Sequence, residues 1–387
     1  MSDAVKIMQA RLPAGIRSEY VDNGNGLRAH VLCAGENTPD KPLAMLLHGF
    51  PELAFSWRHI MLPLVEAGYF VIAPDQRGYG FTIDTAMQSA PGPVGYDTPL
   101  QSWSLLNMVR DALGVVDAFD RSRVDLLVGH DFGSPVAAWA GLVRPDVFTR
   151  VALMSAPFGG PPALPGVQAR SGLAGIDPKA LEKLTPARKH YQWYYATEPA
   201  NRDIMTAPDG LQQFLRDYYH AKSADWAGNA PHPLEPGSPA ALAVMPHYYI
   251  MELDQTMPEA VAASRPDAEA VKQCRWMPDA DMNVYAQIYQ QTGFQGGLQS
   301  YRCGTSGQFT RDYQLFASRT MDQPVCFIAG AQDWGVYQKP GDLQRMESTI
   351  CTQYLGTHLI DGAGHWVQQE QPEAVVEKLL AFAAVTR

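Results

Sequence analysis

The sequence predicts an α/β fold with a mostly parallel sheet, helices on both faces of that sheet, and an inserted helical cap. Two observations support this prediction. First, short apolar runs alternate with stretches of helical spacing, and strands that are apolar throughout are typical of a parallel sheet covered on both faces. Second, the alternation stops near residue 156 and resumes near residue 324. One sheet domain is therefore interrupted by a long segment of different character.

Each predicted element has its own local signal. Residues 18–32 alternate in polarity around an Asp-Asn-Gly-Asn-Gly turn, which predicts an opening hairpin. Residues 57–67 and 104–119 carry helical spacing, and residues 372–384 predict a final helix. The apolar runs that predict buried parallel strands are 42–47, 68–74, 124–128, 150–154, 324–330 and 357–360.

The segment between the two halves of the sheet is predicted to be mainly helical. It lacks the alternation of strand and helix, it is rich in Tyr, Trp, Met and Pro, and it has helical stretches at 210–219 and 282–291. We therefore expect a core domain of residues 1–157 and 301–387 and a cap of residues 158–300. In open parallel sheets the ligand binds beyond the carboxyl ends of the strands. An insert that leaves from such an end would cover the site.

Composition and charge restrict the classes of partner. The chain has 387 residues, of which 46% are hydrophobic and 18% charged, so it can bury a large core. A net charge of -10 argues against nucleic acids and anionic membranes. The five cysteines are scattered without a Cys-x-x-Cys pair, which indicates a reducing cytoplasm and no structural metal. With no signal peptide's apolar core at the N-terminus and no apolar run of about 18 residues, we expect no membrane segment.

A predicted strand and a predicted helix are joined by Gly129-His130-Asp131-Phe132-Gly133. Strand, tight glycine turn and helix form the context of a nucleophile elbow, with aspartate in place of the usual serine. A carboxylate that attacks a saturated carbon gives a stable ester that water can cleave, whereas attack on a carbonyl gives an anhydride that reverts. Asp131 therefore indicates epoxides or alkyl halides as substrates. The alternative is an ordinary turn in which Asp131 caps the helix.

Two further groups follow predicted strands and complete a catalytic set. His365 comes after the last strand and Asp333 after the strand that ends near residue 330, so both lie on the sheet edge predicted for Asp131. A base is needed to activate water, and an acid to orient the base. The chain order of nucleophile, acid and histidine is that of α/β-hydrolases. We assign surface, loop, cap or packing positions to the remaining histidines, His130 included.

Backbone amides at two places are expected to bind a developing oxyanion. One is the N–H of Phe132, directly after the nucleophile, and the other is the N–H of Phe50, after the strand at 42–47. Gly49 allows an unusual backbone there, and Pro51 is compatible with a cis peptide bond. A plain turn is the alternative for residues in this loop.

Four blocks of the sequence resemble the epoxide hydrolases of the α/β-hydrolase fold, of the soluble type without the N-terminal phosphatase domain. They are His48-Gly49-Phe50-Pro51-Glu52, Asp75-Gln76-Arg77-Gly78-Tyr79-Gly80, Gly129-His130-Asp131-Phe132-Gly133 and Gly364-His365-Trp366. The resemblance extends from about residue 18 to the C-terminus. It implies hydrolysis of epoxides to vicinal diols through an ester on Asp131, which water activated by His365 cleaves. It implies no metal and no cofactor.

The resemblance also implies residues that bind the substrate. In this family two cap tyrosines hold the epoxide oxygen, and the segments that carry them look like Tyr191-Gln192-Trp193-Tyr194-Tyr195 and Ser300-Tyr301-Arg302. Tyr191 and Tyr301 are therefore the expected acids. The other expected substrate-binding residues are Phe50, Pro51, Phe132, Gln192 and Trp366. Without the resemblance, so many cap tyrosines would indicate packing alone.

Departures from the family pattern keep other interpretations open. Family members often carry Trp where this chain has Phe132, and the cap is longer between about residues 221 and 271. A haloalkane dehalogenase would use the same three catalytic groups, but its halide needs an N–H donor that the Phe132 side chain lacks. A catalytically inactive binding protein of this fold would usually have lost one of the three groups, and none is missing.

The composition of the cap bears on the substrate. An aromatic, Met-rich cap indicates an apolar pocket, and hence a small apolar epoxide. The choice among such epoxides, the enantiopreference and the oligomeric state, a homo-oligomer included, stay open at this point.

Overall fold

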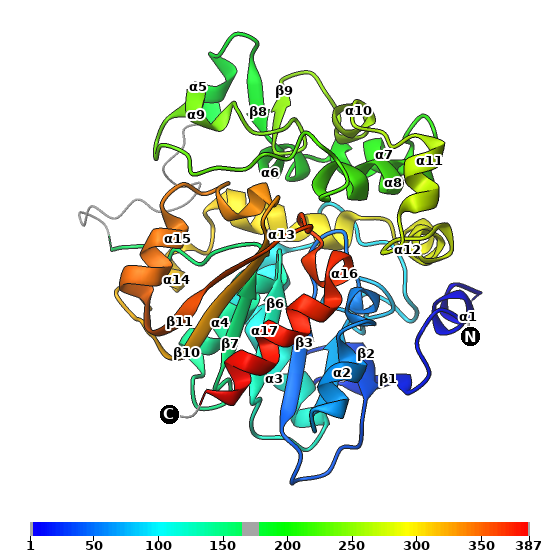
Figure 1. Cartoon of the computed structure of the whole chain (residues 1–387), viewed down its shortest axis with the longest axis vertical. Coiled ribbons are helices and arrows are strands. Elements are labelled where there is room, and N and C mark those ends of the chain that lie inside the picture. The colour runs from blue at the N-terminus through cyan, green and yellow to red at the C-terminus, as the bar shows by residue number, and fades with distance from the viewer. Residues whose placement is uncertain (1–2, 165–177, 386–387) are drawn as a thin grey trace.

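The computed structural model describes residues 3–164 and 178–385. A nine-stranded sheet lies below a layer of helices, as Figure 1 shows. The strands of the sheet are β1 (Ile16–Asp22), β2 (Leu27–Ala34), β3 (Leu43–Leu47), β4 (Phe70–Pro74), β5 (Ile83–Asp84), β6 (Leu126–His130), β7 (Val151–Met154), β10 (Met321–Gly330) and β11 (Cys351–Ile360).

The strand order confirms the predicted fold class. The order is β1-β2-β4-β3-β6-β7-β10-β11, with β5 paired to β2. All neighbours from β4 to β11 run parallel, and the pairs that involve β2 are antiparallel. The predicted opening hairpin and the six predicted parallel strands are all present. β11 begins at Cys351, earlier than predicted, because its first half is a partly exposed edge strand and carries no apolar run.

Different helices cover the two faces of the sheet. Their bounds are α2 (Met61–Glu66), α3 (Leu105–Ala118), α4 (Gly133–Val143) and α17 (Pro372–Ala384). Ala44 and Leu46 of β3 pack in a cluster with α2 and α17. Met45 and Leu47 point the other way, into a cluster with α3 and α4. Every residue of β3 is buried, as expected of a strand covered on both faces.

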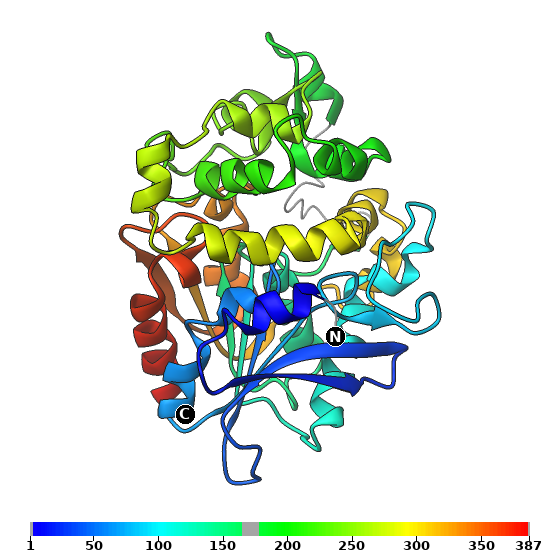
Figure 2. The ribbon, with the colours of Figure 1, turned by 90° about the vertical axis from the view of Figure 1, so that its right-hand side faces the viewer.

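The cap is mainly helical, as predicted. Its helices are α5 (Pro178–Glu182), α6 (Tyr191–Tyr195), α7 (Pro199–Met205), α8 (Leu211–Lys222), α9 (Pro239–Leu242), α10 (Met257–Ala262), α11 (Ala268–Gln273), α12 (Asp279–Thr292) and the first half of α13 (Gln295–Ser306). An antiparallel pair, β8 (Arg188–His190) and β9 (Ile250–Glu252), was not predicted, because strands of three residues leave no periodic signal. Figure 2 shows α12, in yellow, between the other cap helices and the sheet.

The predicted boundary at residue 300 falls inside α13, and the division into two domains stays a prediction. Residues 1–2, 165–177 and 386–387 of the predicted domains lie outside the described residues. Within the described ranges, no helix combines the length and apolarity that crossing a bilayer requires. The remaining helices are α1 (Asp3–Gln9), α14 (Thr310–Gln314), α15 (Asp342–Arg345), α16 (Val367–Glu370), and the short η1 (Ala54–Trp57), η2 (Leu100–Trp103), η4 (Trp334–Val336) and η5 (Met346–Ile350).

The turn between β6 and α4 is sharp and places Asp131 in the left-handed region, with φ of 49°. A Cβ on Gly129 would lie 2.2 Å from the carbonyl oxygen of Gly133. A Cβ on Gly133 would lie 2.2 Å from the carbonyl oxygen of Leu47, in β3. Both glycines are therefore required by the close approach of helix and strands, as the sequence indicated.

Gly133→Ala tests this packing. We expect it to lower the free energy of unfolding by about 1–3 kcal/mol, because the backbone must shift to relieve the overlap with β3. The control is Gly304→Ala on α13, where an added Cβ meets nothing within 4 Å and alanine favours the helix by about 1 kcal/mol. Urea unfolding curves measure both variants. Equal stabilities would contradict the close approach.

Candidate active site

The three predicted catalytic groups meet at the carboxyl ends of the parallel strands. Asp131 follows β6, Asp333 follows β10 and His365 follows β11. Oδ2 of Asp131 lies 3.2 Å from Nε2 of His365. Nδ1 of His365 lies 3.0 Å from Oδ1 of Asp333. All three side chains are buried, so the histidine is held between two carboxylates, one at each ring nitrogen.

Charge coupling sets the protonation of these groups. Burial alone would raise the pKa of Asp131, but the hydrogen bond and positive charge of His365 outweigh it and hold that pKa well below its usual value. The pKa of Asp333 is lowered against burial in the same way, by the charge and hydrogen bond of His365. Burial and Lys222 act to lower the pKa of His365, yet the two carboxylates outweigh them and raise it. Asp131 is therefore ionised at neutral pH, as a nucleophile must be.

A backbone amide binds the other oxygen of Asp131. The N–H of Phe50 donates to Oδ1 at 2.9 Å, and the Phe50–Pro51 peptide is cis, as the sequence indicated. A Cβ on Gly49 would lie 2.3 Å from Cβ of Asp131, so glycine is what allows this loop to approach Asp131. Phe132 caps the start of α4, where helix amides have no intrahelical acceptor. The Phe50 amide is therefore in contact with Asp131, and the role of both amides in binding an oxyanion stays a prediction.

A cavity of about 590 Å³ opens in front of Asp131. Both predicted acids, Tyr191 and Tyr301, line it, and their ring centroids are 5.8 Å apart. Of the predicted substrate-binding residues, Phe132 and Gln192 line the same cavity. The cavity therefore brings a carboxylate and two phenols from distant parts of the chain to one space.

Hydrogen bonds and burial define the state of the two phenols. The Gln192 amide donates to the hydroxyl of Tyr191 at 3.1 Å, and that hydroxyl donates to Oε1 of Gln338 at 3.2 Å. Burial, and after it the charge of Asp131, raises the pKa of Tyr191 well above 10. Burial and the neighbouring Tyr191 do the same to the pKa of Tyr301. Both phenols are protonated at neutral pH and can donate.

The remaining predicted substrate-binding residues pack where cap and sheet meet. The ring of Phe50 lies 5.4 Å from that of Tyr301. The hydroxyl of Tyr219 donates to the carbonyl of Pro51 at 3.3 Å, and the Trp366 indole donates to the carbonyl of Tyr219 at 2.8 Å. Three of the predicted substrate-binding residues lie outside the set that lines the cavity, namely Phe50, Pro51 and Trp366, and their role in substrate binding stays a prediction.

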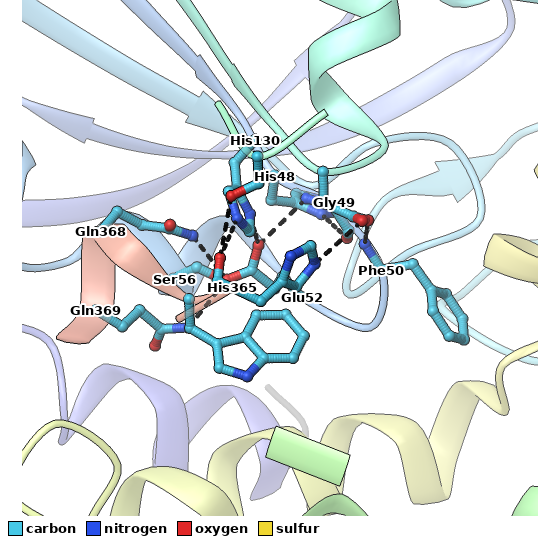
Figure 3. A network of polar contacts seen from close by, with 12 residues as sticks. His48, Gly49, Phe50, Glu52, Ser56, His130, His365, Gln368 and Gln369 are labelled. Atoms are coloured by element: carbon cyan, nitrogen blue, oxygen red, sulfur yellow. Dashed lines mark hydrogen bonds and ion pairs between the residues drawn. The ribbon is translucent and has the colours of Figure 1, made fainter. Parts of the chain in front are cut away.

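A buried network beneath His365 was not predicted. Nδ1 of His130 lies 2.5 Å from Oε2 of Glu52, and Nε2 of His130 donates to the carbonyl of His365 at 2.7 Å (Figure 3). Gln368 and Gln369 donate to the other oxygen of Glu52 at 2.8 and 2.9 Å. The network holds the backbone of His365. Two of the quoted sequence blocks contain Glu52 and His130, but only the fold brings them together.

Comparison with known proteins places this geometry in a family. A family model for the alpha/beta hydrolase fold matches residues 42–191. "Epoxide hydrolase A" of Mycobacterium tuberculosis is 31% identical over 371 residues, which cover 95% of this chain and 98% of the relative. The chain belongs to the epoxide hydrolase family. An epoxide hydrolase of Caballeronia sordidicola is 30% identical over 97% of this chain and 96% of the relative.

Solved structures agree with this assignment. An epoxide hydrolase from an endophytic Streptomyces is 27% identical and superposes with a TM-score of 0.70, covering 96% of both chains. The resemblance inferred from the sequence blocks is therefore confirmed, and the α/β-hydrolase fold with it.

Asp333→Asn tests the coupling around His365. Removing the charge should lower the pKa of His365, since Asp333 raises it, and should reduce turnover roughly 10²–10⁴-fold, because a misoriented or weaker base takes the proton poorly. An NMR titration of the imidazole measures the first effect. Asp322→Asn is the matched control, because this exposed aspartate lies in β10, the strand that Asp333 follows. Titrations of His365 that coincide in the two variants would contradict the assignment of Asp333.

Proposed function

We propose that this protein hydrolyses apolar epoxides to vicinal diols in two covalent steps. The observation that carries the proposal is the cavity lined by Asp131, Tyr191 and Tyr301 together. Opening an epoxide requires a nucleophile at carbon and a proton donor at oxygen. An ionised carboxylate can serve as the first, and protonated phenols as the second. Family membership supports the same activity.

The first step opens the ring. A carboxylate oxygen of Asp131 attacks a ring carbon, the C–O bond of the epoxide breaks, and the released alkoxide takes a proton from Tyr191 or Tyr301. An alkoxide is costly in an apolar cavity, so donors that polarise the C–O bond before attack stabilise the charge as it develops. The product is a glycol monoester of Asp131.

The second step cleaves the ester. Nε2 of His365, oriented by Asp333, takes a proton from water, and the hydroxide attacks the carbonyl carbon of Asp131. The oxyanion forms where Oδ1 now accepts the N–H of Phe50, with the Phe132 amide as the second donor. Losing one such donor typically costs about 2.7–4 kcal/mol. The bond between the carbonyl carbon and the alkoxy oxygen then breaks, the alkoxy oxygen takes the proton held by His365, and the diol leaves. The proton that remains on the Asp131 carboxyl returns to the tyrosine phenolate, which restores both the carboxylate and the acid.

The lining of the cavity supports an apolar substrate. Phe132, Trp139 and Phe158 contribute aromatic surface near the nucleophile. Such a surface favours aryl or alkyl epoxides over strongly polar ones. A cytoplasmic location and a homo-oligomeric state stay predictions of the sequence.

An isotope experiment tests the covalent route. In a single turnover in heavy-oxygen water with excess enzyme, the label should enter the Asp131 carboxylate, because water attacks the ester carbonyl. Mass spectrometry of the peptide that contains Asp131 and of the diol locates it. Label that appears first in the diol would mean direct attack by water and would remove Asp131 as the nucleophile.

Removing the phenols tests the acids. Tyr191→Phe and Tyr301→Phe should each slow ester formation roughly 10²–10⁴-fold, less where one phenol substitutes for the other. The double variant should be nearly inactive towards styrene oxide while still folded, as circular dichroism can verify. Tyr194→Phe is the control, because this buried tyrosine lies on the same helix as Tyr191 but outside the cavity lining. A double variant that keeps more than about a tenth of wild-type turnover would place less than about 1.4 kcal/mol of the barrier on these groups and contradict their role.

The same variants separate this activity from that of a dehalogenase. A halide leaves as a stable anion and needs no proton, so a dehalogenase would not depend on the two phenols. Turnover of 1-bromobutane that exceeds that of styrene oxide, and that survives in the double variant, would favour the dehalogenase. No turnover of either compound would favour an inactive binding protein.

A further inference from the structure

We propose that Lys222 is a positioning residue for ester hydrolysis, whose positive charge keeps the His365 imidazole unprotonated once Asp131 has become an ester. The inference rests on the proposed two-step function and deepens it. It assigns a role in the second step to a cap residue that neither the sequence blocks nor the cavity includes.

The backbone of Lys222 is fixed to the catalytic loop. Lys222 is the last residue of α8, and its carbonyl accepts the N–H of His365 at 2.8 Å. Two residues on, the N–H of Ala224 donates to Oε2 of Glu370 at 2.7 Å. The same oxygen accepts the N–H of Gly364 at 2.9 Å. The end of α8, in the cap, is therefore held to the loop that carries His365 by hydrogen bonds.

The side chain of Lys222 is buried in a cage of aromatic rings. Only 2% of the residue is exposed. Nζ lies 4.9, 5.3, 5.4 and 5.9 Å from the ring centroids of Tyr249, Tyr218, Trp366 and Tyr248. The faces of aromatic rings attract a cation. The Trp366 ring in turn packs edge-on against the imidazole of His365, with centroids 4.7 Å apart, so the same ring contacts both the ammonium group and the base.

Within the described residues, no carboxylate pairs with Lys222 inside the 4.0 Å limit of an ion pair. A buried charge that no carboxylate neutralises acts on its neighbours with little solvent screening. A positive charge beside His365 disfavours the imidazolium form and favours the Asp131 carboxylate. Both effects have the sign that the reaction needs.

The effect on His365 matters most in the second step. In the free protein, Asp131 and Asp333 both stabilise the imidazolium. Esterification removes the charge of Asp131, and Lys222 then opposes the remaining carboxylate, Asp333. The imidazole is left neutral and able to take a proton from water. Several titratable or charged groups surround Lys222 and His365. They are Asp131, Asp333, His130, Glu370, Tyr218, Tyr248 and Tyr249.

An NMR titration in the Asp131→Asn background tests the inference directly, because asparagine is neutral like the ester. The probe is the ¹⁵N-labelled imidazole of His365, identified by its loss in His365→Gln. Adding Lys222→Met should raise the titration midpoint of His365 by about half a pH unit or more, by the Coulomb energy of a nearby charge. Lys222→Arg keeps the charge and should leave the midpoint near that of the Asp131→Asn parent. Lys222→Gln is a second neutral variant should the Met variant fail to fold.

Kinetics on the protein with Asp131 intact give a second readout. Lys222→Met should move the acid limb of ester hydrolysis to higher pH by the same half unit, and Lys222→Arg should not. A folded neutral variant whose His365 midpoint equals that of the parent would overturn the inference and reduce Lys222 to packing. The titration needs no turnover, so it tests the effect of Lys222 on His365 even if the wild-type protein forms no ester with epoxides. A failure to form the ester would reject the proposed function alone.

Discussion

The contact between Asp131 and His365 is the interaction on which the rest of the structure depends. It joins residues 234 positions apart and buries a carboxylate with an imidazole, two groups that resist burial singly. The sharp turn after β6, the close approach of Gly49 and the network around His130 all hold these two side chains within hydrogen-bond distance. A buried pair that loses one partner leaves an uncompensated charge. The turn, the Gly49 loop and the His130 network must therefore all keep the two side chains in contact.

The cap does more than exclude water from this pair. Helices α6 and α13 bring Tyr191 and Tyr301 to the cavity, and the end of α8 binds the backbone of His365. The cap thus contributes both side chains that line the cavity and a backbone contact to the loop of His365. An insert between two halves of a sheet is suited to this, since both of its ends start at the edge where the strands of a parallel sheet place catalytic groups.

Local patterns were enough to predict the sheet and the meeting of Asp131, Asp333 and His365, because each of these residues follows a strand with its own signal. β3 is apolar throughout, and the glycines at 129 and 133 mark the turn that carries Asp131. Pairings over long separations left no such signal. Glu52 meets His130 across 78 positions, and the rings around Lys222 come from three separate segments, so nothing local predicts either. Only the family resemblance distinguishes Tyr191 and Tyr301, the predicted acids, from the many other tyrosines of the cap.

The proposed reaction needs Asp131 ionised, Tyr191 and Tyr301 protonated and, during ester hydrolysis, His365 neutral. The placement of the charged groups explains how these states can coexist. Burial pushes every group here towards its neutral form. Asp131 stays ionised because His365 contacts one of its oxygens and the Phe50 amide contacts the other. Tyr191 and Tyr301 face Asp131 instead of a cation, so burial and that negative charge keep them protonated. A lysine on their side of the cavity would favour phenolate and remove the acids. Lys222 lies outside the cavity lining, and its ammonium group contacts the Trp366 ring that packs against His365, so its charge acts on the base.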